Sequence, residues 1–211
     1  SEMCIRDRLQ SGHTNLKMKI YFDGDSWTWG GELEDNKTER FSAIISKELG
    51  AEEYNYAKPK CSNDSIIRRL LLDNNISEYD FAIIQMTYPS RTEFYDGKYI
   101  RVATQDVKMK HKRKSIRNKD DLIFWTHYYN NEYNERYFAD KEKIHHKIIC
   151  DHCQLHNVPL ILTTINNWDT NLKFDLELEH TKYPRAPENH PNAEGHRIIA
   201  KDILSLLTTY K

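Results

Sequence analysis

The sequence predicts an α/β fold in which a parallel sheet is covered by helices on both faces. Short apolar runs typical of buried strands alternate with segments whose apolar residues repeat at helical spacing. Hydrophobic residues make up 38% of the chain and charged residues 30%, a mixture typical of globular proteins. A chain of 211 residues is long enough for one domain with a sizeable core. We therefore expect a single domain spanning residues 18–211.

The first half of the chain supplies three strands and two helices. An apolar run at residues 18–23 predicts the first strand, and Gly50 can end a helix over residues 36–49. Ser62 can cap the second helix. The apolar face expected of that helix consists of Ile66, Ile67, Leu70 and Leu71. The other two strands are expected at residues 54–57 and 79–87.

The second half repeats the alternation and closes the domain. Residues 138–156 have the pattern of a long helix, and residues 158–165 form a buried strand entered through Pro159. Residues 192–207 read as the closing helix, because their apolar residues share one face. Strands that alternate with helices in this way form parallel sheets, because each crossover places a helix on a face of the sheet.

Two segments do not follow this alternation. Residues 1–17 have no clear period and are expected to be disordered or extraneous to the domain. Residues 88–136 are polar, with a basic run at 108–117 and aromatic residues near the end. We interpret them as an insertion over the carboxyl edge of the sheet, where substrate contacts are expected. A solvated loop is favoured for the basic run over binding of phosphate, nucleic acid or an anionic glycan.

Charge and cysteine content narrow the class of protein. The net charge of −1 gives no field that would attract nucleic acid, and no apolar run is long enough to span a membrane. Cys4, Cys61, Cys150 and Cys153 are too few for a disulfide scaffold, which favours reduced thiols and a cytoplasmic location. The last two cysteines and the neighbouring histidines have the ligand types for zinc, but they fall in an expected helix, where core packing is favoured. No metal or other cofactor is expected.

The most informative motif is the tetrapeptide Asp23-Gly24-Asp25-Ser26, which directly follows the first strand. This position places a serine hydroxyl at the carboxyl edge of the sheet, where open α/β folds bind ligands. Near the other end, His190 precedes the closing helix. A serine hydroxyl needs a nearby base to act as a nucleophile, and an imidazole can accept and return its proton near neutral pH.

These segments resemble the SGNH hydrolases, also called GDSL-type esterases. Residues 22–30 (FDGDSWTWG) are close to the nucleophile block of the family, and residues 190–200 (HPNAEGHRIIA) are close to its histidine block. Residues 55–64 and 85–91 occupy the positions of the second and third blocks. The resemblance covers most of the chain and implies a three-layer, flavodoxin-like parallel sheet. It further implies that Ser26 is the nucleophile.

The resemblance also implies a base and an acid. His190 would be the base. The usual aspartate lies three residues before the histidine, but Pro187 stands at that position. Glu188 is the nearest carboxylate and is our candidate for orienting the imidazole, with a backbone carbonyl as the alternative.

The oxyanion hole departs further from the family pattern. The backbone N–H of Ser26 is the first expected donor, and Lys60 stands where the family has a glycine that supplies the second. The third block lacks the usual Gly and Asn in register. Asn63, Gln85 or Arg91 is expected to supply a substitute donor. Arg91 is also a candidate substrate-binding residue, and so is Trp27, for which packing in the core is the favoured alternative.

The function expected from these observations is hydrolysis of a carboxylic ester through an acyl-enzyme. A small-molecule or glycan ester is the expected substrate class, with a carbohydrate O-acetyl group preferred. Two other classes stay open at this point. One is a binding module that kept the fold while its oxyanion hole decayed, and the other is a nucleic-acid-associated protein that uses the basic run.

Overall fold

The structure is a computed structural model, and it describes residues 17–95, 99–102, 119–128, 135–165 and 171–209. The expectations for residues 1–16 and for the basic run at 108–117 therefore lie outside the described residues.

The centre of the molecule is a five-stranded sheet with the order β2-β1-β3-β6-β7, in which all neighbouring strands are parallel. Its strands are β1 (Lys19–Asp23), β2 (Glu52–Asn55), β3 (Phe81–Met86), β6 (Leu160–Thr164) and β7 (Leu176–Glu177). Every residue of β3 is buried, as expected for a central strand covered on both faces. The predicted α/β fold class is confirmed.

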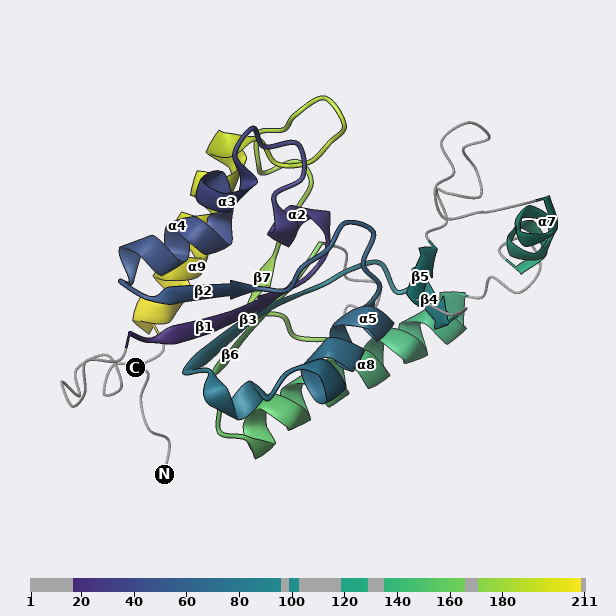
Figure 1. Ribbon diagram of the computed structural model, residues 1–211, viewed down its shortest axis with the longest axis horizontal. Coiled ribbons are helices and arrows are strands. Elements are labelled where there is room, and N and C mark those ends of the chain that lie inside the picture. Colours follow the sequence, from purple (N-terminus) through teal and green to yellow (C-terminus); the bar gives the residue numbers. More distant parts are fainter. Residues whose placement is uncertain (1–16, 96–98, 103–118, 129–134, 166–170, 210–211) are drawn as a thin grey trace.

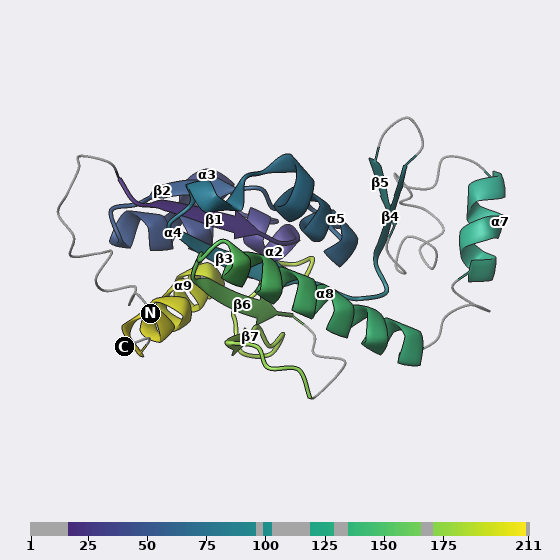
Figure 2. The same ribbon diagram turned by 90° about the horizontal axis from the view of Figure 1, so that it is seen from below.

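Helices cover both faces of this sheet (Figures 1 and 2). On one face lie α4 (Phe41–Glu48) and α9 (Ala193–Thr209), and on the other lie α5 (Asn63–Arg68) and the long α8 (Glu135–Leu155). Side chains of β1 alternate between the two faces. Ile20 and Phe22 join the core under α4 and α9, while Tyr21 joins the core under α5 and α8. The sheet therefore separates two apolar cores.

Two details differ from the sequence-based expectations. The helix expected at 36–49 is divided into α3 (Asn36–Glu39) and α4, because Arg40 between them is extended (φ −68°, ψ 148°). The α5 helix continues as a π-helical turn over Arg69–Asp73. This wider turn buries Arg69, which pairs with Asp23, and leaves Leu71 40% exposed instead of on the apolar face.

The described parts of the expected insertion contain a hairpin and a helix. Strands β4 (Thr92–Tyr95) and β5 (Tyr99–Val102) pair antiparallel, and α7 spans Lys119–His127. Glu93 joins the hairpin to α5, because its carboxylate accepts hydrogen bonds from Ser65 Oγ and Arg68 Nε. A short 3-10 turn, η2 (Ile76–Glu78), leads into β3. None of the described helices is long and apolar enough to cross a bilayer.

Candidate active site

Ser26 lies where the sheet edge turns into a short helix. It is the first residue of α2 (Ser26–Trp29), and Asp25 caps this helix by accepting a hydrogen bond from the Trp27 N–H at 2.9 Å. The turn needs a glycine at position 24, because a Cβ there would lie 2.4 Å from Thr28 Oγ1. The first N–H groups of a helix have no partner within the helix, so the Ser26 N–H is available to a ligand oxygen.

The structure brings His190 to this serine from the other end of the chain. The imidazole Nε2 lies 3.0 Å from Ser26 Oγ, within hydrogen-bond reach. His190 lies in a tight turn, whose ends form a β-bridge between Arg185 and Pro191 and in which Ala186 N–H donates to the His190 carbonyl at 2.9 Å. The serine and histidine singled out from the sequence therefore form a hydrogen-bonded pair at the carboxyl edge of the sheet.

The carboxylate on the imidazole is Glu32, which corrects our expectation for Glu188. Glu32 Oε2 lies 2.7 Å from His190 Nδ1. Glu188 is exposed, and it reaches the pair only through its backbone N–H, which donates to Glu32 Oε1 at 2.7 Å. The physical reason is geometric, since Glu32 closely follows α2, the helix that begins at Ser26, whereas the Glu188 side chain is exposed to solvent.

Glu32 is held as an anion by donors from the histidine loop. Partial burial acts to raise its pKa, but the N–H groups of Glu188 and His190 and the imidazole outweigh this and lower the pKa of Glu32 below its usual value. The His190 N–H donates to Oε2 at 3.1 Å. An ionised carboxylate on Nδ1 keeps the proton on that nitrogen and leaves Nε2 as the acceptor for the serine proton.

Gly31 makes room for the imidazole. A Cβ at this position would lie 3.0 Å from His190 Cδ2 and 3.2 Å from the Ser26 carbonyl oxygen. The Gly31 N–H also donates to that carbonyl at 2.7 Å. The sequence Gly30-Gly31-Glu32 contains the signal that the sequence analysis missed. Gly31 leaves room for the imidazole, and the carboxylate that contacts it follows directly.

Asp25 is the centre of a buried polar network next to Ser26, the candidate nucleophile. Its Oδ1 accepts from Gln85 Nε2 at 2.9 Å, and its Oδ2 accepts from Thr87 Oγ1 at 2.9 Å and from Arg91 Nη1 at 2.6 Å. Burial acts to raise the pKa of Asp25, but the charge of Arg91 and these hydrogen bonds lower it overall. Asp25 is therefore an anion that fixes the start of α2.

Two expected oxyanion donors are used inside the protein. Gln85 is 1% exposed, and its amide bridges Thr28 Oγ1 and Asp25. Asn63 is also 1% exposed, and its amide pairs with the backbone N–H and carbonyl of Thr87 at 2.8 and 3.0 Å. These amides brace the loops of the site, which corrects the expectation that either one faces the oxyanion.

Lys60 has the backbone conformation that the family's glycine favours. Its φ angle is 60°, in the left-handed region, which costs a residue with a side chain about 1–2 kcal/mol. Its loop is attached to the turn that carries Ser26, because Lys58 N–H donates to the Gly24 carbonyl at 3.3 Å. Glu32 and Asn189 also have positive φ angles. Strained backbone of this kind gathers at functional sites.

Trp27 belongs to the core. It is 3% exposed, and its ring lies edge-on to His180 with the ring centroids 4.9 Å apart. Trp27 therefore packs in the core, which was the favoured alternative to substrate contact. The His180 Nε2 is in turn 3.0 Å from the Tyr88 hydroxyl.

The cysteines and histidines of α8 take part in packing. Cys153 is buried in the core under α8, and burial raises its pKa to about 12, which leaves the thiol protonated at neutral pH. Cys150 lies 3.8 Å from His146 Nδ1. Within the part of the chain that the structure describes, no group of three or more potential ligand side chains is arranged to hold a metal.

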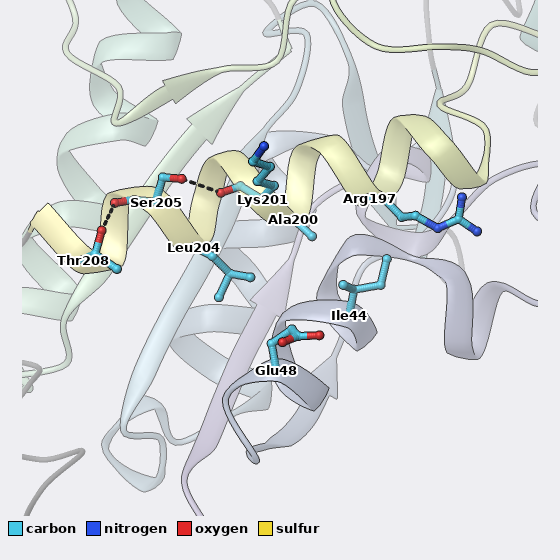
Figure 3. Close-up of a pocket in the computed structure, with 8 residues that line it drawn as sticks. All are labelled: Ile44, Glu48, Arg197, Ala200, Lys201, Leu204, Ser205 and Thr208. Atoms are coloured by element: carbon cyan, nitrogen blue, oxygen red, sulfur yellow. Dashed lines mark hydrogen bonds between the residues drawn. The ribbon is translucent and has the colours of Figure 1, made fainter.

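A groove of about 400 Å³ lies apart from this site, between α4 and α9 (Figure 3). Its hydroxyl groups are satisfied within α9, because Ser205 Oγ donates to the Lys201 carbonyl and Thr208 Oγ1 donates to the Ser205 carbonyl. Ile44 and Leu204 add aliphatic surface to its lining, and Glu48, Arg197 and Lys201 add charged groups. The groove contributes no residue to the Ser26–His190 pair.

Comparison with known proteins gives matches to solved structures only: no protein-family profile and no curated protein matches the sequence. The lipase Lip_vut3 from a goat rumen metagenome is 12% identical with a TM-score of 0.51, and the match covers 90% of this chain and 97% of that one. The esterase EstA from Pseudoalteromonas sp. is 11% identical with a TM-score of 0.51, covering 91% and 97%. A GDSL-like lipase from Bacteroides thetaiotaomicron is 12% identical with a TM-score of 0.48, covering 92% and 89%.

The chain has the SGNH hydrolase fold. The resemblance found in the sequence is thus confirmed at the level of the fold, over almost the whole chain. Within this fold the protein departs from the family pattern in the third block, which lacks the usual Gly and Asn in register, and at two further places. The carboxylate on His190 comes from the nucleophile loop, and Lys60 replaces a glycine while keeping a left-handed backbone.

Proposed function

We propose that this protein is a serine hydrolase that cleaves a carboxylic ester through an acyl-enzyme. The observation that carries the proposal is the continuous chain of contacts from Ser26 Oγ to His190 Nε2 (3.0 Å) and from His190 Nδ1 to Glu32 (2.7 Å). A nucleophile, a base and a carboxylate that orients the base are the parts that acyl transfer requires. The SGNH fold is that of two solved proteins described as a lipase and an esterase.

The reaction follows from these positions. As Ser26 Oγ forms a bond to the ester carbonyl carbon, His190 Nε2 takes the hydroxyl proton. The tetrahedral oxyanion is stabilised by the backbone N–H of Ser26 and by that of Lys60. His190 then gives its proton to the leaving alcohol as the ester bond breaks. Water attacks the acyl-enzyme with the same proton transfers in reverse order, which releases the acid and restores Ser26.

A carbohydrate O-acetyl group remains our proposed substrate. This choice rests on the breadth of the family and on the aromatic and basic residues of the insertion, many of which lie outside the described residues. The competing proposal, a binding module with a decayed site, predicts no covalent chemistry at Ser26.

Active-site labelling separates the two proposals. A fluorophosphonate probe should label the wild-type protein at Ser26, because the activated hydroxyl displaces fluoride from phosphorus. Ser26→Ala and His190→Ala should both prevent labelling, and 4-nitrophenyl acetate should be hydrolysed only by the wild type. A folded wild-type protein that neither reacts with the probe nor hydrolyses short-chain esters would support the binding module instead.

A further inference from the structure

Arg91 is fixed beside the nucleophile by one end of its guanidinium group. Its side chain is 10% exposed. Nη1 donates to Asp25 Oδ2 at 2.6 Å and to Thr87 Oγ1 at 2.7 Å, and it lies 3.4 Å from the Cys61 carbonyl oxygen. These three partners come from the loops after β1, after β3 and before α5, the loops that surround Ser26. The guanidinium is therefore anchored to the residue that precedes the nucleophile.

The other edge of this guanidinium has no partner among the described residues. Arg91 Nε is buried and makes no hydrogen bond, and Nη2 makes none either. The N–H groups of Nε and Nη2 point in nearly the same direction from the planar group, so together they form a fork for two oxygen atoms. A buried donor without an acceptor is unfavourable, and native proteins rarely leave one without a reason.

Three other arginines show what this edge normally does in the chain. Arg69 presents Nε and Nη2 to the two oxygens of Asp23, at 2.9 and 2.6 Å. Arg40 does the same with Glu53 at 2.8 and 3.0 Å, and Arg68 does so with Glu93 at 2.9 and 3.4 Å. Each of these forks is closed by a carboxylate from the chain itself. The fork of Arg91, beside the candidate nucleophile, has none.

We infer that the fork of Arg91 binds a carboxylate on the substrate, so the ester cleaved at Ser26 carries a carboxylate near its scissile bond. This inference rests on the proposed function and narrows its substrate class. An O-acetylated acidic sugar would satisfy both proposals. The carboxylate takes the place that Asp23, Glu53 and Glu93 take on the other three arginines.

The surroundings fit an anionic group. Arg185 lies close enough to act on Tyr88 and His180: burial raises the pKa of Tyr88 and lowers that of His180, and the charge of Arg185 lowers both. Arg91 and Arg185 both place positive charge near Tyr88, where the charge of Asp25 acts in the opposite direction. The Tyr88 ring lies beside the Arg91 guanidinium, with its centroid 5.1 Å from Cζ. Because Nε is closed to water, a carboxylate meets Nη2 first and reaches Nε when neighbouring side chains shift.

The test uses two pairs of esters that differ by a carboxylate. Mono-4-nitrophenyl succinate and 4-nitrophenyl butyrate differ on the acyl side, and 4-acetoxybenzoate and its methyl ester differ on the alcohol side. We expect the wild type to favour the charged member of one pair in kcat/KM. Arg91→Lys keeps the charge beside Asp25 but removes the fork, and should reduce that preference about tenfold. Arg40→Lys, the matched control, should leave it unchanged.

Binding to the Ser26→Ala variant decides the inference without turnover. The charged ester of the favoured pair should bind about tenfold more tightly than its neutral partner, and adding Arg91→Lys should abolish the difference. Equal binding of both members in both pairs would overturn the inference, and so would an Arg91→Lys variant whose kcat falls equally on charged and neutral esters. A wild-type protein without esterase activity would contradict the proposed function. The binding comparison would still show whether Arg91 binds a carboxylate.

Discussion

His190 and His196 come from the same short segment of the chain, but their surroundings give them opposite properties. His190 has both ring nitrogens engaged, one by Ser26 and the other by Glu32, and its side chain is 24% exposed. His196 is fully buried and stacks on Phe41, with Nδ1 accepting from the Phe41 N–H at 3.2 Å and Nε2 unpartnered. Burial, reinforced by the nearby His190, lowers the pKa of His196 to about 4. The comparison shows that packing decides whether an imidazole can exchange protons.

Replacing each histidine by alanine should separate these two roles, with the largest effect on turnover at His190. His190→Ala should lower kcat by about 10⁴-fold or more, since the base is lost, with little change in the free energy of unfolding. His196→Ala should instead reduce the free energy of unfolding by about 2–4 kcal/mol while folded molecules keep their turnover. Steady-state kinetics and urea unfolding measure both. A His196→Ala protein that is stable but inactive would break the comparison.

Replacing the carboxylate on His190 should have the next largest effect. Glu32→Gln should lower kcat by about 10²–10⁴-fold, because a neutral amide does not stabilise the imidazolium and does not fix its tautomer. The matched control is Glu188→Gln, which changes an exposed carboxylate two residues from His190 and should keep the wild-type rate. If Glu188→Gln lowered kcat and Glu32→Gln did not, the role assigned to Glu32 would be wrong.

The pH dependence of the free energy of unfolding tests the lowered pKa of His196. In the unfolded chain this histidine titrates near 6.5, whereas its folded pKa is about 4. Between these values the unfolded state binds more protons, so acid favours unfolding. The free energy of unfolding should fall by about 2 kcal/mol between pH 7 and pH 5 on account of this group. Urea unfolding of wild type and His196→Gln should show that only the wild type has this contribution; identical slopes would contradict it.

The same two histidines show how far the sequence could predict the molecule. The apolar patterns placed β1, β2, β3, β6, α8 and α9 within a few residues, because the apolar run of β1 and the stripes of α8 and α9 reflect burial directly. The two-residue strand β7 was not predicted. The pairing of Ser26 with His190 also followed from two motifs. Burial of His196, by contrast, depends on Phe41 from a distant helix, which no local pattern reports.

The errors within the site have a common cause. Glu188 was favoured because it is close to His190 in sequence, but the left-handed turn at Glu32 brings a different carboxylate to the imidazole. Gln85 was one of three candidates for a substitute oxyanion donor, but its amide donates to Asp25. Which polar side chains pair with each other depends on the distances between loops, and these distances are set only when the chain is folded.

The position of Glu32 has a consequence for the order in which the candidate site is assembled during synthesis. Ser26 and Glu32 leave the ribosome close together, whereas His190 follows 158 residues after Glu32. Both oxygens of Glu32 accept backbone N–H groups of the late segment, at Glu188 and His190. The carboxylate that orients the imidazole therefore also docks the segment that carries it. In a nascent chain the Ser26–His190 pair cannot form until this segment docks, so docking and assembly of the pair are one event.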